Sequence, residues 1–180
     1  MALRKSSAYS KRPARPYTRK SKVRSKSYIK AVPNSKVVKF KMGAIKDFEQ
    51  NKYSTIIHVI SKENCQIRDN SIEAVRQYLN RWLQVKVGKD FYVEVKVCPH
   101  HVLRENKMIT GAGADRMQTG MARSFGRTIG RAALVKKGQT MFIVGVKNAK
   151  QEIEARKLIS SIKARLPCKV GTETVRVKVE

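Results

Sequence analysis

The densest group of side chains capable of chemistry is the stretch Cys98-Pro99-His100-His101. Thiolate and imidazole are good zinc ligands, and imidazole is also a common general base in enzymes. A structural zinc site needs four suitably spaced ligands, however, and the other cysteines and histidines of the chain are isolated in the sequence. We therefore expect no bound metal here, and we expect both histidines to lie against RNA or in a hydrogen-bonded turn.

Few carboxylates stand near these histidines. Glu105 and Asp115 are the only acidic residues between Glu94 and Glu152. Arg116 follows Asp115 directly, and a neighbouring arginine lowers the pKa of a carboxyl group, which favours an ion pair over general acid catalysis. The local sequence suggests no Ser-His-Asp or Cys-His arrangement. The sequence thus predicts a protein that is not an enzyme and needs no cofactor.

Residues 105–132 hold five of the ten glycines and show no sustained helical or strand periodicity. The run GAGADR at residues 111–116 lacks the third glycine and the βαβ context of a dinucleotide-binding turn. Glycine lets a backbone approach phosphate closely, and arginine can bind phosphate with two hydrogen bonds. The methionines of this stretch suit either contact with exposed bases or packing at the base of the loop. We expect an RNA-contacting loop with the cations Arg104, Lys107, Arg116, Arg123, Arg127 and Arg131.

The charge of the chain points to a polyanionic partner. The chain has 40 Lys and Arg but only 13 Asp and Glu, which gives a formal net charge of +27. The surface of a small soluble domain rarely needs a net charge of magnitude above about 8. No segment approaches the roughly 20 apolar residues of a membrane span, so nucleic acid is favoured over a membrane. Three widely spaced cysteines form no disulfide framework and fit a reducing, cytoplasmic setting. A mitochondrial transit peptide is the weaker interpretation of the basic N-terminus, because Pro13 and Pro16 interrupt it.

Residues 1–33 are expected to form an extended basic arm. Fifteen Lys and Arg precede Asp47, the first acidic residue. Tyr9, Tyr17 and Tyr28 stand among these cations, and rings that alternate with positive charges suit stacking on bases while the cations meet phosphates. A solvated, disordered tail is the alternative.

Residues 34–180 are expected to form one α+β domain with a mostly antiparallel sheet and two helices. Alternating or β-branched runs predict strands at 38–42, 55–60, 91–97, 132–135, 140–146 and 175–179. One helix is predicted to begin with a capping box of Asn70 and Glu73, and the other with Asn148 and Gln151. Trp82 and the apolar stripes of both helices are predicted to lie in the core.

The stretch CPHHVLRENKMITGAGADRMQTGMARSFG, residues 98–126, closely resembles the large-subunit ribosomal protein family called L ten e in archaea and eukaryotes and L sixteen in bacteria. The N-terminal RPYTRK, residues 15–20, fits the same family, and the similarity extends over most of the chain before weakening after about residue 146. The chain departs from the usual family pattern at Cys98, Ala122 and Thr128.

The resemblance implies an α/β-hammerhead-like fold bound to large-subunit rRNA beneath the central protuberance, in cytoplasmic, archaeal-type ribosomes beside other ribosomal proteins. It also implies that the loop at about 99–131, and residues 103–117 in particular, points toward tRNA acceptor ends near the peptidyl-transferase centre. The residues expected near tRNA are Arg104, Asn106, Lys107, Met108, Gly111, Gly113, Asp115 and Arg116.

The residues expected to bind rRNA lie in the arm, at the two histidines and in the segment after the loop. They are Arg4, Lys5, Lys11, Arg12, Arg15, Tyr17, Arg19, Lys20, Lys22, Arg24, His100, His101, Arg123, Phe125, Gly126, Arg127 and Arg131. No membrane or small-molecule substrate is expected. Two rival hypotheses remain: an architectural nucleic-acid-binding protein outside the ribosome, and an RNA-modifying or RNA-cleaving enzyme that uses His100 or His101.

Overall fold

The computed structural model describes residues 4–26, 28–106, 111–113 and 126–177. It confirms an α+β fold, with every strand pair of the described residues antiparallel. The strands form two sheets rather than the single sheet that the sequence suggested. Several predicted site residues lie outside what the structure describes: Lys107, Met108, Asp115, Arg116, Arg123, Phe125 and the side chain of Arg24.

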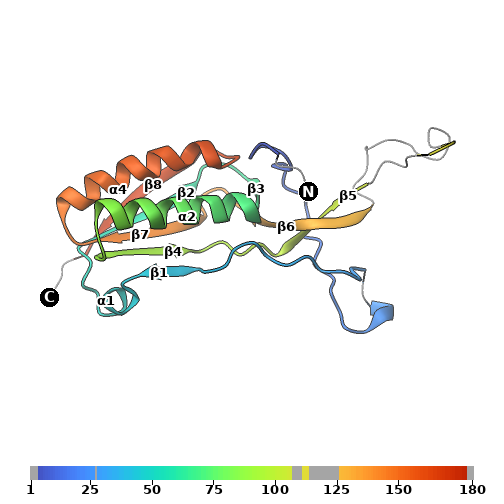
Figure 1. The fold of residues 1–180 in the computed structure, drawn as a ribbon, viewed down its shortest axis with the longest axis horizontal. Coiled ribbons are helices and arrows are strands. Elements are labelled where there is room, and N and C mark those ends of the chain that lie inside the picture. Colours follow the sequence, from blue (N-terminus) through green and yellow to red (C-terminus); the bar gives the residue numbers. More distant parts are fainter. Residues whose placement is uncertain (1–3, 27, 107–110, 114–125, 178–180) are drawn as a thin grey trace.

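The larger sheet has five strands in the order β1-β4-β7-β2-β8. Its bounds are β1 Lys41–Gly43, β2 Thr55–Ser61, β4 Phe91–Val95, β7 Thr140–Val146 and β8 Val170–Arg176. The long helices α2 (Asp69–Lys86) and α4 (Ala149–Ile162) lie side by side over one face of this sheet (Figure 1). The core sits between the helices and the sheet, because the apolar stripes of α2 and α4 are buried there against Ile57, Val93 and Val144.

The smaller sheet has three strands in the order β3-β6-β5, so β3 and β5 are its edges. It consists of β3 Cys65–Arg68, β5 His101–Glu105 and β6 Arg127–Val135. Strands β5 and β6 pair as a hairpin that extends away from the helices at the end of the molecule opposite the C-terminus (Figure 1). The segment between them, residues 106–126, contains most of the expected loop.

Several sequence predictions need correction. The described residues contain three α-helices, because a short α1 (Ile45–Glu49) joins β1 to the loop before β2. Strands β3 and β5 were not predicted, β6 begins five residues earlier than expected, and the last described strand is centred earlier than 175–179. The strand expected at 38–42 is reduced to β1, which begins at Lys41.

The start of α2 was also predicted wrongly. The helix begins at Asp69 after an extended Arg68, so Asn70 lies inside it and does not form a capping box with Glu73. One Asp69 oxygen accepts the Asn70 N–H at 2.8 Å and the other accepts the Lys36 N–H at 3.2 Å. This carboxylate therefore serves both its own helix start, where negative charge is favourable, and the segment after the arm.

The other helix start is as predicted. Asn148 precedes α4, and the Gln151 side chain accepts the Asn148 N–H at 3.1 Å. Trp82, by contrast, is not in the core. It is 37% exposed on α2, whereas Leu79 and Leu83, on the side that faces the sheet, are fully buried.

Candidate nucleic-acid interface

The N-terminal segment is bound along both edges of the smaller sheet. At the β3 edge, the Gln66 N–H donates to the Ser10 carbonyl at 2.8 Å. At the β5 edge, the Val102 N–H donates to the Tyr17 carbonyl at 3.0 Å. An exposed sheet edge is a row of unpaired backbone groups that invites association with other chains. The arm pairs part of each row, so the small sheet and the arm stabilise each other.

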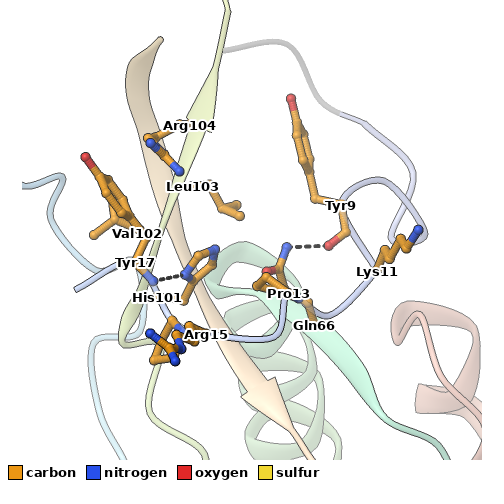
Figure 2. A pocket seen from close by; sticks show the side chains of 11 residues that line it. Tyr9, Lys11, Pro13, Arg15, Tyr17, Gln66, His101, Val102, Leu103 and Arg104 are labelled. Atoms are coloured by element: carbon orange, nitrogen blue, oxygen red, sulfur yellow. Dashed lines mark hydrogen bonds between the residues drawn. The ribbon is translucent and has the colours of Figure 1, made fainter. Parts of the chain in front are cut away.

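Two side chains of β3 hold the arm further by its carbonyl groups. The Gln66 amide donates to the Tyr9 carbonyl at 2.6 Å, which Figure 2 marks with a dashed line. The Arg68 guanidinium donates to the carbonyls of Arg4 and Lys5 at 2.8 and 2.6 Å. Arg68 is buried, and buried donors of this kind are costly unless they are paired. The arm therefore satisfies groups that β3 would otherwise leave unpaired.

His101 is the anchor of the arm at β5. Its Nδ1 accepts the Tyr17 N–H at 2.7 Å (Figure 2), so both backbone groups of Tyr17 bond to β5. Burial, reinforced by the nearby His100 and Arg104, lowers the pKa of His101 from its ordinary value of 6.5. The neutral ring that results is the form that can accept a hydrogen bond at Nδ1.

His100 has a different environment. Its Nδ1 lies 3.0 Å from the Cys98 carbonyl, in the irregular segment that precedes β5. The side chains of His100 and His101 thus both make contacts within the protein. Direct contact of either ring with RNA stays a hypothesis.

A stacked pair of side chains separates two hollows. The Arg104 guanidinium lies 3.7 Å from the centre of the Tyr17 ring, a geometry that suits cation–π attraction. One hollow, of about 420 Å³, is drawn in Figure 2 and is walled by the arm and β5; its lining includes Tyr9, Lys11, Pro13, Arg15 and His101. The other, of about 550 Å³, shares Tyr17 and Arg104 and includes Tyr28, Lys30 and Arg127.

The end of β5 is tied to the beginning of the arm. Arg4 donates to Glu105 Oε1 at 2.7 Å and to the Tyr9 hydroxyl at 2.7 Å. The hydrogen bond from Arg4 lowers the pKa of Glu105, so this carboxylate is charged and is not a proton donor at neutral pH. This pair joins the base of the expected loop to the N-terminal segment.

Gly126 is required by packing at the start of β6. A Cβ at this position would lie 2.1 Å from the Glu105 carbonyl oxygen, far closer than real contacts allow. Close approach of β5 and β6, and not only approach of RNA, therefore accounts for a glycine here. In the following residues, Thr128 and Arg131 donate to the carbonyls of Ala31 and Pro33 at 2.9 and 2.6 Å, which fixes the end of the arm on β6.

The predicted site residues fall into three environments. Most of the arm cations are exposed, as are Gly111, Gly113 and Arg127. Arg12, Tyr17, Arg104, Asn106 and Arg131 are half-buried, and His101 is buried. The sequence did not predict that Gln66, Arg68 and Glu105 seat the arm. Their partners in the arm lie 57, 64 and 101 residues away, so no local pattern marks this role.

Other kinds of site find little support in the described part of the chain. No three His, Cys, Asp or Glu side chains come together there as potential metal ligands. Among the same residues, no helix combines the length and apolar character needed to cross a membrane.

Comparison with known proteins decides the family. The model of the family described as Ribosomal protein L16p/L10e matches residues 13–172. The chain belongs to the L16p/L10e family of ribosomal proteins. Three relatives carry the name "Large ribosomal subunit protein uL16". That of Thermofilum pendens is 40% identical over 93% of this chain and 94% of its own length. That of Methanococcus aeolicus is 37% identical over 98% and 99%, and that of Methanoculleus marisnigri is 45% identical over 66% and 68%.

Membership of the L16p/L10e family assigns a structural role to the chain and not an enzymatic one. The geometry agrees with this assignment. His101 is engaged with the arm backbone, and Glu105 is paired with Arg4. His101 and Glu105, two of the side chains that could have suggested catalysis, therefore hold the arm on the hairpin.

Proposed function

We propose that this L16p/L10e protein binds large-subunit rRNA through its arm and the β5–β6 hairpin, as a structural constituent of the large ribosomal subunit. One observation carries the proposal. The arm is held on the small sheet mainly by its backbone groups, including the carbonyls of Arg4, Lys5, Tyr9, Ser10 and Tyr17. Its cationic side chains, among them Lys5, Lys11, Arg15, Lys20 and Lys22, remain exposed.

An arm that is held by its backbone and keeps its cations exposed suits recognition of a folded RNA. A flexible basic tail loses conformational entropy when it binds RNA. A docked arm has already lost part of this entropy on folding, so binding costs it less. Phosphate contacts fix position and register, and each one releases counterions from the RNA. The docked arm would therefore act as a rigid positive surface continuous with Arg104 and Arg127 of the hairpin.

We further propose that the loop carried by the hairpin lies near the acceptor ends of tRNA, as the family resemblance implies. The support comes from the hairpin, because β5 and β6 extend away from the core and the loop joins them in the sequence (Figure 1). Deletion of residues 108–114 should leave large subunits able to form but slow the tRNA-dependent steps of translation. Unchanged translation rates in a subunit that contains the deleted chain would contradict this part of the proposal.

The rRNA proposal is tested by sedimentation of cell lysate on sucrose gradients, before and after a wash in several hundred millimolar salt. We expect the chain to remain with large subunits after the wash, since shape-specific docking outlasts the steep salt weakening of generic polyanion binding. Recovery among free proteins or across all nucleic acid would favour the rival hypothesis, an architectural nucleic-acid-binding protein outside the ribosome.

A matched pair of variants locates the contact. The arm variant removes three exposed charges by changing Lys11, Lys20 and Lys22 to Gln. The control variant removes three exposed charges near the ends of α2 and α4 by changing Lys86, Lys150 and Lys163 to Gln. Both variants lose the same net charge. We expect only the arm variant to dissociate at a lower salt concentration, and equal salt sensitivity would remove the arm from the interface.

A further inference from the structure

The larger of the two hollows described above lies between the arm and the hairpin, and it has features of a site for a nucleotide base. It measures about 550 Å³, within the range of small-molecule sites, and it lies beside the Arg104–Tyr17 stack. Apolar and aromatic surface from Tyr17, Tyr28, Ile29 and Ala31 lines it. All four of these residues belong to the arm, and hydrogen bonds to the carbonyls of Tyr28 and Ala31 hold it there.

Tyr28 presents an open aromatic face there. Tyr28 is 65% exposed, although the neighbouring Ile29 is only 4% exposed. The Tyr28 carbonyl accepts a hydrogen bond from the Tyr17 hydroxyl at 3.3 Å. The Arg19 guanidinium covers one face of the ring at 4.2 Å from the ring centre, and Arg19 is itself held by a 2.9 Å hydrogen bond from Nε to the Lys26 carbonyl. Arg19 does not line the hollow. Arg19 thus covers one face of the ring, and the exposure of Tyr28 leaves much of the remaining ring surface accessible.

The charges around the hollow select the kind of occupant. Lys30, Arg104 and Arg127 all line it, and none of the described residues that line it is acidic. An uncharged apolar ligand would gain nothing from these cations. A nucleotide offers a π-face to Tyr28 and a phosphate to the three cations. Stacking of a base on an aromatic side chain, combined with nearby cations, is the usual means by which proteins hold single-stranded nucleotides.

We propose that this hollow binds one unstacked RNA nucleotide, with its base against the open face of Tyr28 and its phosphate among Lys30, Arg104 and Arg127. The inference rests on the proposed rRNA-binding function and assigns a subsite to it. Because any base has a π-face, the site would select an unpaired nucleotide at a defined place in a folded RNA and not a particular base. Tyr28 is then the residue that makes the arm recognise RNA conformation as well as charge.

The test compares AMP with ribose 5-phosphate on the full-length chain, by NMR titration or calorimetry at one salt concentration. The two probes share the sugar and phosphate and differ in the base, so non-specific charge effects cancel. We expect AMP to bind at least about fivefold more tightly. Tyr28→Leu should reduce this ratio to about one, Tyr28→Phe should retain it, and Phe40→Leu, which removes another exposed ring, should leave it unchanged.

Equal binding of both probes to the unmodified chain, or a ratio that survives Tyr28→Leu, would overturn the proposed subsite. A ratio abolished by Phe40→Leu would place the base elsewhere and overturn it as well. Sedimentation of the same variants with large subunits tests the parent proposal separately. Loss of the AMP preference with retained sedimentation would support the subsite as one contact among many, whereas loss of sedimentation by the unmodified chain would contradict rRNA binding itself.

Discussion

At the scale of single residues, the most consequential side chain is His101, because its neutral form holds Tyr17. A lowered pKa in the folded state means that the unfolded chain takes up the proton first as the pH falls. The stability contributed by neutral His101 is therefore present above the ordinary value of 6.5 and is lost as the pH falls below it. Acidification should weaken the anchor of the arm before the core unfolds.

Hydrogen exchange measures this effect directly. We expect the protection factor of the Tyr17 amide to fall several-fold between neutral pH and a pH well below 6, after correction for intrinsic exchange. His101→Gln supplies an acceptor that does not titrate, so protection in this variant should be independent of pH. Equal protection of the Tyr17 amide at both pH values in the unmodified chain would show that its bond to Nδ1 is unimportant.

Glu73 provides a second residue-scale prediction. It accepts hydrogen bonds from Arg76 at 2.8 Å, from Gln77 at 2.9 Å and from the Val38 N–H at 3.4 Å, and these donors lower its pKa. Glu73→Ala leaves the half-buried Arg76 guanidinium without its carboxylate partner and should cost about 1–2 kcal/mol of unfolding free energy. Glu154→Ala removes an exposed pair with Lys157 and should cost less than about 0.5 kcal/mol. Chemical denaturation compares them, and equal costs would contradict the argument.

At the scale of elements, the hairpin of β5 and β6 depends on a contact that only glycine permits. Gly126→Ala would force a Cβ against the Glu105 carbonyl and should destabilise the protein by about 2–3 kcal/mol, as overpacking does. Gly130→Ala, four residues further on in β6, meets its nearest atom at 4.0 Å and should change stability by no more than about 0.5 kcal/mol. Thermal unfolding of both variants tests this, and similar midpoints would show that the strands can separate freely.

The elements also show which parts of the fold could be read from the sequence. Strand β2, strand β7 and helix α4 were predicted because periodicity or a capping box marks them locally. Strand β3 has only four residues, and its Gln66 and Arg68 are buried because the arm supplies their partners. A local pattern contains no information about a partner nearly 60 residues away. The same reason hid the role of Glu105.

Trp82 illustrates the opposite error. Its position fits the helical spacing of the buried residues, yet the sheet occupies only the sector of α2 that contains Ile72, Val75, Leu79 and Leu83. The helix presents Trp82 beside that sector. Its ring is tilted relative to the Tyr78 ring, with ring centres 6.1 Å apart. Spacing predicts the face of a helix, but the width of the covered sector depends on the tertiary packing.

At the scale of the whole molecule, the dominant property is the charge of +27. Self-repulsion of this size opposes compaction, and salt weakens repulsion between exposed charges over a Debye length of roughly 10 Å at 0.1 M. The midpoint of thermal unfolding of the isolated chain should therefore rise as KCl increases, while its affinity for RNA falls. Scanning calorimetry over a KCl series measures the first effect. A midpoint that stays constant or falls would mean that ion pairs within the fold outweigh the repulsion.

The seating of the arm has a consequence for the order in which a newly made chain can fold. Tyr17 leaves the synthesising ribosome 84 residues before its partner His101, and Tyr9 precedes Gln66 by 57. Non-local contacts of this kind must wait until both partners exist. The arm is thus synthesised before the strands that seat it, and its cations are without that support until β3, β5 and β6 have been made.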